Sequence, residues 1–570
     1  QGQGVRGTVS GVSSLIFTAR AVSTDYTDEA AYILTWPATG TAPAPVAGLT
    51  NSGDPLRPGY TRIERNSIYG SVAPGSDPWQ WDLLSGNGTT WPYPEWDPAL
   101  GRFDLPDLSA ALAGVAQVRI RFVGASDDRH AIDARINGYP VGSFTFAGKT
   151  GGLLQGSVPA SVLQPSGNEL TLVYSAQHQD GTPAPSGYVY LDYLDVAAPS
   201  RAAAGTAVLA DVRAYEPDLP SLSGVKYLIV THPLFKAQAD RLAELKTEER
   251  LKAAVVVVDT AYDAFSGGVQ EPKAIAALIR KAAQTSRTLQ YVVLFGDDAL
   301  DPRNYLGGAT PSYVPSIMGW DGTSLVPNEN AYADVDGDGA PDLAIGRLPV
   351  TTIEEATAVV DKIEVQTATL ASSNNVHVFV SDDSRESDAR FEESAREMSA
   401  LLPSSSTSVM AEMSAGVGLA RAALFGSWQQ GVTMTHYFGH GGPEIWTDEA
   451  LFSVDDVPDL QASMPPMVLL AWACQSQFYQ NYYGPSVNEA LFLAPSSGAL
   501  ASFGPVGISS PERQRDVYER VYRDLYKNGL SLGEIIRRAK REALAESYLN
   551  QGVVDGFMFF GDPSLKIPRP

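Results

Sequence analysis

Cysteine is almost absent from this sequence, which contains one, Cys474, among 570 residues. A lone cysteine cannot form an intramolecular disulfide or supply the thiolates of a structural zinc site. The fold therefore depends on apolar cores, and a chain of this length can bury several. Cys474 itself is either a small buried hydrophobe, the usual role of a free cysteine, or a nucleophile.

Positive charge is also scarce. The 41 Lys and Arg residues stand against 65 Asp and Glu, for a formal net charge of −24. A field of that sign repels phosphate, which argues against nucleic acid as a partner. No apolar run approaches the roughly 18 residues of a membrane-spanning helix, so no transmembrane segment is expected. At about 100–200 residues per domain, the length predicts three or four domains.

The first 200 residues have the pattern of a β domain. Short runs alternate apolar and polar residues between turn-forming residues, as half-buried strands do; they are 14–18, 117–123, 170–174 and 188–194. Asn137-Gly138 predicts a hairpin because both residues accept positive φ. We expect an all-β sandwich or jelly roll over 1–200. The aromatic stretch that starts at Trp79 and Trp81 is either an ordered loop or a platform for a carbohydrate or cell-surface ligand.

A linker rich in small residues is placed at 201–220, and the pattern changes after it. Near-continuous apolar strands now alternate with helices, which predicts an α/β fold with parallel sheets. The expected strands are 226–230, 253–258, 291–297, 377–380, 432–438 and 467–473, and the expected helices 235–251, 272–284 and 388–402. We divide this part into two subdomains, 221–370 and 371–570.

His440 and Cys474 each follow directly after a predicted core strand. Ligands of parallel sheets lie beyond the carboxyl ends of the strands, so neighbouring strands would bring the two side chains together. A nearby imidazole lowers the pKa of a thiol and makes it nucleophilic. The amides of Gly441 and Cys474 could form an oxyanion hole, with Gly442 and Gln475 as further substrate contacts. The alternative is that the glycines form an ordinary turn.

An acidic loop lies at 334–342. Asp334, Asp336, Asp338 and Asp342 alternate with small residues, and hard carboxylate oxygens in this spacing suit Ca²⁺. The loop lacks the distal Glu and the flanking helices of an EF-hand. An acidic turn without metal is the alternative.

Six motifs in order resemble peptidase family C25, the gingipain-like cysteine peptidases with a caspase-like fold. They are Tyr437-Phe438-Gly439-His440-Gly441-Gly442, Ala471-Trp472-Ala473-Cys474, 289–297, 344–348, 488–491 and 560–565. The resemblance covers roughly 225–568 and leaves 1–200 uncovered. It implies a caspase-like catalytic unit preceded by the β-sandwich.

The resemblance implies a cysteine endopeptidase that acts through a thioester. Cys474 would attack the scissile carbonyl, and His440 would protonate the leaving amine. Glu386-Ser387-Asp388 matches the run that carries the S1 aspartate of the arginine-specific gingipains, so Asp388 would bind Arg, or else Lys, at P1. Asp388 could instead be the N-cap of the following helix. Asp382 or Asp383 would orient His440, or both are solvated loop acids. Gingipain-like enzymes also carry structural calcium.

These interpretations predict a secreted or cell-surface enzyme whose signal peptide has been removed, with protein or peptide substrates. The β domain is a binding module or a propeptide. A transpeptidase of the same family is the alternative activity, because it shares the chemistry up to the thioester. The alternative of another class is a non-catalytic surface-binding protein.

Overall fold

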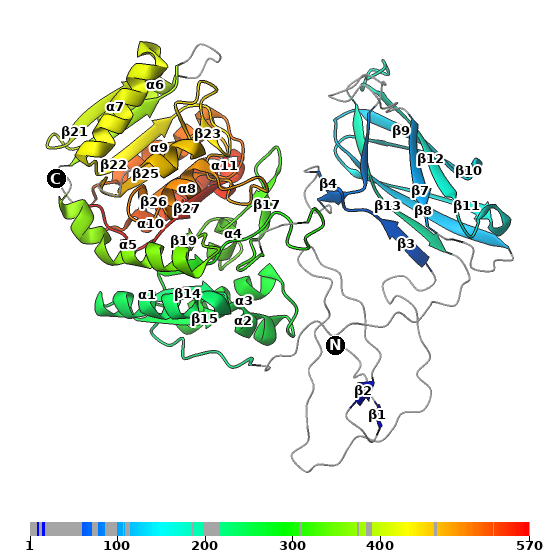
Figure 1. The fold of residues 1–570 in the computed structure, drawn as a ribbon, viewed down its shortest axis with the longest axis horizontal. Coiled ribbons are helices and arrows are strands. Elements are labelled where there is room, and N and C mark those ends of the chain that lie inside the picture. Colours follow the sequence, from blue (N-terminus) through cyan, green and yellow to red (C-terminus); the bar gives the residue numbers. More distant parts are fainter. Residues whose placement is uncertain are drawn as a thin grey trace. The chain divides into compact units, whose positions relative to one another are not determined.

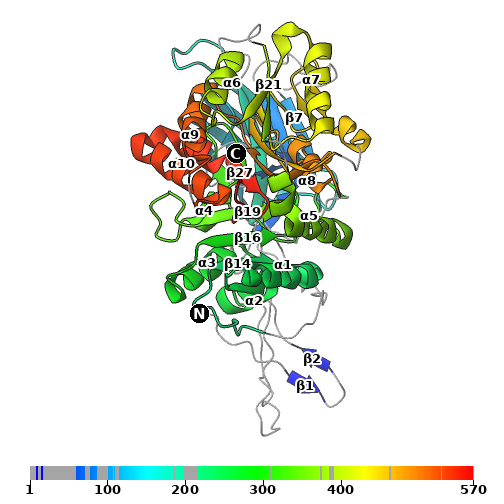
Figure 2. The ribbon, with the colours of Figure 1, turned by 90° about the vertical axis from the view of Figure 1, so that its left-hand side faces the viewer.

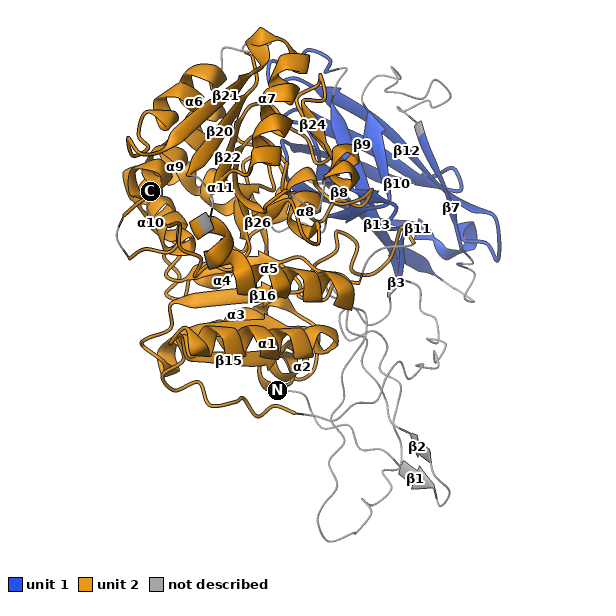
Figure 3. Cartoon of the chain, turned by 60° about the vertical axis from the view of Figure 1, so that its left-hand side comes forward, with its two compact units in different colours: residues 1–213 blue, residues 214–570 orange. Residues whose placement is uncertain are grey.

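The computed structural model describes residues 8–10, 14–16, 60–70, 78–85, 100–106, 108, 114–184, 187–197, 216–307, 311–372, 375–383, 390–460, 464–527 and 529–568. The chain forms two compact units, Gln1–Arg213 and Ala214–Pro570 (Figure 3, blue and orange). The boundary falls inside the predicted linker.

The strands of the N-terminal unit are antiparallel. They are β1 (Thr8–Ser10), β2 (Ser14–Ile16), β3 (Tyr60–Glu64), β4 (Ile68–Tyr69), β5 (Trp79–Gln80), β6 (Asp82–Ser85), β7 (Leu100–Leu105), β8 (Val115–Gly124), β9 (Arg129–Ile136), β10 (Tyr139–Ala147), β11 (Gly151–Pro159), β12 (Asn168–Gln177) and β13 (Tyr188–Ala197). Two sheets, ordered β10-β9-β12-β7 and β11-β8-β13-β3, form a sandwich, and β6 also pairs with β13 (Figure 1).

The sandwich follows from the period-2 pattern. Alternate residues of β8, β9 and β12 are buried, and one apolar cluster joins Ile120 of one sheet to Leu172 of the other. Asn137 (φ 50°) and Gly138 (φ 78°) form the predicted hairpin turn. Trp79 and Trp81 are only 3% and 4% exposed, so these two rings belong to the core of this unit, whereas the rest of the aromatic stretch, at 86–96, lies outside the described residues.

A ten-stranded sheet runs through the C-terminal unit. Its order is β15-β14-β16-β19-β27-β26-β25-β22-β20-β21, and every pair is parallel except β26 with β27. The strands are β14 (Tyr227–Thr231), β15 (Ala253–Val257), β16 (Tyr291–Phe295), β19 (Ala344–Leu348), β20 (Val376–Ser381), β21 (Thr407–Glu412), β22 (Met434–Phe438), β25 (Met467–Trp472), β26 (Ala499–Pro505) and β27 (Phe557–Phe560). The strands of the predicted subdomain 221–370 form one end of this sheet, and those of the predicted subdomain 371–570 form the other.

Helices cover both faces of the sheet (Figure 2). They are α1 (Lys236–Glu248), α2 (Val258–Phe265), α3 (Pro272–Thr285), α4 (Asn330–Ala333), α5 (Ile353–Ser372), α6 (Phe391–Ser399), α7 (Val417–Gln430), α8 (Val487–Leu493), α9 (Pro511–Asp524), α10 (Leu532–Glu546) and α11 (Gln551–Asp555). Two short hairpins, β17 (Met318–Trp320) with β18 (Leu325–Pro327) and β23 (Ile445–Trp446) with β24 (Phe452–Ser453), lie outside the main sheet.

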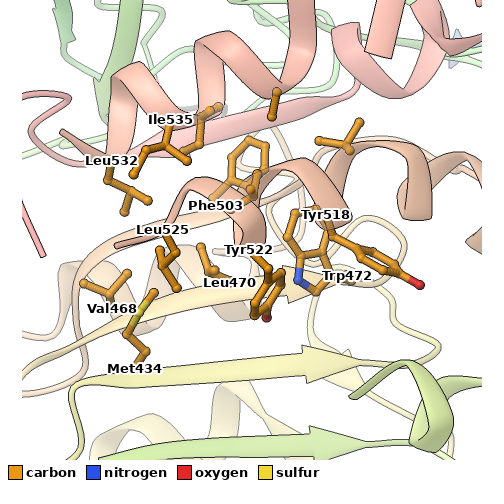
Figure 4. Packing of buried hydrophobic residues seen from close by; sticks show 14 of the residues in the cluster. Met434, Val468, Leu470, Trp472, Phe503, Tyr518, Tyr522, Leu525, Leu532 and Ile535 are labelled. Carbon is orange, nitrogen blue, oxygen red and sulfur yellow. The ribbon is translucent and has the colours of Figure 1, made fainter. Parts of the chain in front are cut away.

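Strand β25 is buried on both faces, as its unbroken apolar sequence predicts. Val468, Leu470 and Trp472 pack in the cluster formed with α9 and α10 (Figure 4), whereas Leu469 and Ala471 join the cluster of α7 and α8. This two-sided burial holds the end of the strand, and so the start of the loop that carries Cys474, in a rigid position.

The helix predicted at 388–402 is shorter in the structure. It begins at Phe391, and Arg390 occupies the N-cap position, so Asp388 is not the cap of this helix. Within the ranges described above, no helix is both long and apolar enough to span a bilayer.

Candidate active site

His440 and Cys474 stand at the same edge of the sheet. Strands β22 and β25 are neighbours and parallel, with Phe438 paired to Trp472. His440 and Cys474 each come two residues after this last pair, and the Gly439 amide still donates to the Trp472 carbonyl at 3.1 Å. A Cβ on Gly441 would lie 3.0 Å from the Cys474 carbonyl oxygen. The two loops are therefore in contact where the sequence predicts that they meet.

The Cys474 thiol is half-buried and faces Ser509. Its Sγ donates a hydrogen bond to the Ser509 carbonyl oxygen at 3.7 Å. Burial raises the pKa of this thiol, and the negative charge of Asp321 raises it further, although the hydrogen bond to Ser509 acts the other way. Burial of the thiol outweighs the other influences on its pKa in this structure, and the lowering of this pKa by an imidazole stays a prediction.

His440 is exposed and its main chain is fixed on both sides. Its amide donates to Asp382 Oδ2 at 3.1 Å, and its carbonyl accepts from the Tyr437 hydroxyl. The imidazole packs edge-on against Phe391 of α6, with ring centroids 5.1 Å apart. Of the two predicted orienting acids, Asp382 thus contacts the main chain of the histidine. Asp382 is 5% exposed, and burial raises the pKa of its carboxyl group.

The two predicted oxyanion-hole amides remain available. Gly441 forms a bridge with Trp446 in which the flanking residues make the hydrogen bonds, from Gly442 to Ile445 and from Thr447 to His440. Among the described residues, the backbone bonds of this region leave the amides of Gly441 and Cys474 without a backbone acceptor. Unpaired N–H groups beside a nucleophile are what an oxyanion requires.

The other predicted substrate contacts lie in the same loops. Gly442 is used for the bond to Ile445, and Gln475 has left-handed backbone (φ 51°) and donates its amide to Gly507. This conformation is uncommon for a residue other than glycine and turns the chain sharply after Cys474. Asp388 lies outside the described residues, and Asp383 is partly exposed.

The acidic loop gathers three of its four predicted calcium ligands. Carboxylate oxygens of Asp334, Asp336 and Asp338 lie within 4.8 Å of one another. Asp342 accepts a hydrogen bond from Arg541 at 2.9 Å, and the same guanidinium lies 3.5 Å from Asp338 Oδ2. The structure therefore gives the fourth predicted ligand a cationic partner from α10.

Three residues near the thiol were not identified from the sequence. Asp321 lies between β17 and β18, while Ser509 and Gln514 lie at the start of α9. The Gln514 side chain donates to the carbonyls of Ala473 and Ser509, at 3.2 and 3.3 Å. None of them belongs to one of the motifs, although Ser509 lies in the loop after β26, so only their spatial neighbours reveal them.

Comparisons with known proteins agree with this fold. The model of "Peptidase family C25" matches residues 221–568. Among solved structures, the Arg-specific cysteine proteinase gingipain R is 16% identical with a TM-score of 0.48, over 61% of this chain and 79% of that one. Dimeric latent PorU from Porphyromonas gingivalis is 17% identical with a TM-score of 0.45, over 90% of this chain and 52% of that one.

The carbohydrate-binding module CBM36 in complex with calcium and xylotriose is 15% identical with a TM-score of 0.16, over 24% of this chain and 98% of that one. No curated protein matches the chain.

Proposed function

The chain belongs to peptidase family C25 and is a cysteine peptidase in that general sense; on this premise we propose that Cys474 is its nucleophile and His440 its general acid and base. The single observation that supports this proposal most is the register of β22 and β25: His440 and Cys474 each follow two residues after the last paired residues of these strands, Phe438 and Trp472.

The reaction uses both side chains in turn. The Cys474 thiol transfers its proton to His440, and Sγ attacks the scissile carbonyl. The resulting oxyanion accepts hydrogen bonds from the Gly441 and Cys474 amides. His440 then protonates the leaving amine, the C–N bond breaks, and a thioester remains. Water attacks the thioester with His440 as base and regenerates the thiol.

Asp382 supports this proposal as the residue that positions His440. Its carboxylate accepts the His440 amide, and the neighbouring Gly439 leaves no room for a side chain, since a Cβ there would lie 2.7 Å from Asp382 Cβ. Acting through the main chain, Asp382 fixes where the loop leaves β22. We retain Asp383 as the alternative in the same loop.

We propose cleavage after basic residues, with Arg preferred over Lys. Support comes from the Glu386-Ser387-Asp388 run and the pairing of a carboxylate with guanidinium. The acidic net charge of −24 also favours cationic peptides. Gly442 and Gln475, in the loops on either side of the dyad, are proposed to contact the substrate main chain.

Calcium is proposed as a structural ion of the loop at 334–342. The donor set fits: three carboxylates converge although they repel one another, and a hard divalent cation would relieve that repulsion. Asp334, Asp336 and Asp338 would hold it. The ion would stabilise the connection between α4 and β19 and would take no part in the reaction.

We further propose that the enzyme acts outside the cell or on its surface, where millimolar calcium would fill even a weak site. The N-terminal sandwich would bind a carbohydrate or another surface ligand. Because Trp79 and Trp81 are buried, such a ligand would use other residues of that unit.

A peptide library tests the catalytic proposal. We expect the wild-type protein to cleave after Arg, Cys474→Ala and His440→Ala to lose cleavage, and His178→Ala, which alters an exposed histidine of the other unit, to retain it. Asp388→Asn should lose the preference for Arg, whereas Asp455→Asn, at an exposed acid elsewhere in the same unit, should keep it. Cleavage by Cys474→Ala at the wild-type rate would refute the nucleophile. Ligated product on addition of an amine acceptor would favour a transpeptidase.

A further inference from the structure

Asp321 is a buried carboxylate in the turn between β17 and β18 that joins two distant segments. It is 9% exposed. Oδ1 accepts the amides of Thr323 and Ser324, both at 2.7 Å, and Oδ2 accepts the amide of Ile508 at 2.7 Å. The first two bonds shape its own turn, whereas the third holds a loop 187 residues away in the chain.

That loop lies directly against the nucleophile. The Gly507 carbonyl accepts the Gln475 amide at 3.0 Å, and the Ser509 carbonyl accepts the Cys474 thiol at 3.7 Å. The residues on both sides of Ile508 therefore contact Cys474 or its neighbour. A displacement of Ile508 would move both contacts together.

The fit between Asp321 and this loop leaves no free space. A Cβ on Gly507 would lie 2.3 Å from Asp321 Oδ2, and a Cβ on Gly552 would lie 2.3 Å from the Asp321 carbonyl oxygen. Glycine at both positions is what allows the carboxylate to reach the Ile508 amide.

We propose that Asp321 is a positioning residue for Cys474. It holds the loop 507–509, in which the Ser509 carbonyl accepts the hydrogen bond of the thiol and so orients it. This inference rests on the proposed role of Cys474 as nucleophile. The Asp321 carboxylate accepts three of its four hydrogen bonds from backbone N–H groups and the fourth from the Ser324 hydroxyl at 3.4 Å. A carboxylate fits this set, whereas the nitrogen of a carboxamide would face an N–H group.

The negative charge of Asp321 also disfavours ionisation of the Cys474 thiol. Asp321 raises the pKa of Cys474, and burial together with Asp382, Glu449 and Cys474 in turn raises the pKa of the nearby Tyr437. Loss of the carboxylate should therefore have two opposite effects. The thiolate becomes easier to form, while the geometry for attack on a substrate is lost.

Because Cys474 is the only cysteine in the sequence, alkylation reports on this thiol alone, and the two effects can be measured separately. In Asp321→Asn we expect kcat/KM to fall about tenfold or more, because small misplacements of reacting groups are costly. We expect alkylation of the thiol by iodoacetamide at pH 7 to become about threefold faster or more, with its pH inflection lowered. Asp263→Asn is the matched control, since Asp263 is also buried and accepts a distant backbone amide, that of Glu216, at 2.8 Å. It should change neither quantity.

A second variant tests the contact between Asp321 and the loop 507–509 by a change in the loop. Gly507→Ala keeps the charge but displaces the carboxylate, and it too should lower kcat/KM about tenfold. The proposal is overturned if Asp321→Asn matches Asp263→Asn in both measurements, if its activity falls with an unshifted alkylation inflection, or if folded Gly507→Ala retains full activity. Alkylation does not require peptidase activity, so a failure of the proposed function would remain distinguishable.

Discussion

Acidification should destabilise the catalytic unit through two buried histidines. His377 of β20 and His436 of β22 are both fully buried and stacked, with His377 Nδ1 2.9 Å from His436 Nε2. The hydroxyl of Tyr526 lies 2.7 Å from His377 Nε2, and that of Tyr522 lies 2.6 Å from His436 Nδ1. The four side chains form one hydrogen-bonded series, which Asn375 joins at the Tyr526 end, and no carboxylate is among these described partners.

Burial without a negative partner lowers the pKa of both imidazoles, that of His377 to about 4. In the unfolded chain a histidine titrates near 6.5, so below that pH the unfolded state binds more protons than the folded state. Stability is therefore present above about pH 6.5 and is lost as the pH falls toward 4. For His377 alone, the loss of unfolding free energy is about 2 kcal/mol at pH 5 and about 3 kcal/mol at pH 4. His436 adds a loss of the same sign.

Urea unfolding at pH 7 and pH 5 measures this loss, with hydrogen exchange of β20 and β22 peptides assigning the transition to this unit. His377→Gln removes one titrating group and should shrink the loss between the two pH values by about 2 kcal/mol. Tyr526→Phe removes a hydrogen bond to His377 and keeps both imidazoles, so it should lower stability at both pH values and leave the pH-dependent loss in place. An identical loss in wild type and His377→Gln would refute the reasoning.

Three further predictions follow from other contacts. Alkylation of Cys474 should keep accelerating beyond pH 9, because burial raises its pKa, and a plateau below pH 8 would contradict this. Lys362 donates hydrogen bonds to the carbonyls of Phe492, Ala494 and Ala499. Lys362→Met should therefore lower the free energy of unfolding, measured with urea, by about 3 kcal/mol or more. Lys236→Met, at an exposed lysine, is the control and should lower it by less than about 1 kcal/mol. Calcium should raise the melting temperature, with the rise lost in Asp336→Asn and kept in Asp342→Asn; equal behaviour of the two variants would refute the ligand assignment.

Much of the fold follows from local sequence pattern. Alternation with period 2 predicts β8, β12 and β13, and Asn137-Gly138 predicts the turn between β9 and β10. The unbroken apolar run of β25 predicts a strand buried on both faces. Once β22 and β25 are recognised as parallel neighbours, the placement of His440 and Cys474 at one edge follows, because parallel strands end on the same side.

What lies around the dyad depends on partners far away in the chain. Asp321 reaches Ile508, and Arg541 neutralises Asp342, which the spacing alone assigned to calcium. The direction of the Cys474 pKa shift is of the same kind, since it depends on how much water the surrounding loops remove from the thiol.

The sequence by itself thus indicated several strands of each unit, three of the helices and the two residue types at the strand ends, because these depend on neighbours a few residues apart. Only the tertiary structure decided which carboxylates face the thiol, the histidine or a cation. Desolvation and charge are summed over atoms that are close in space, and a linear pattern carries no information about those distances.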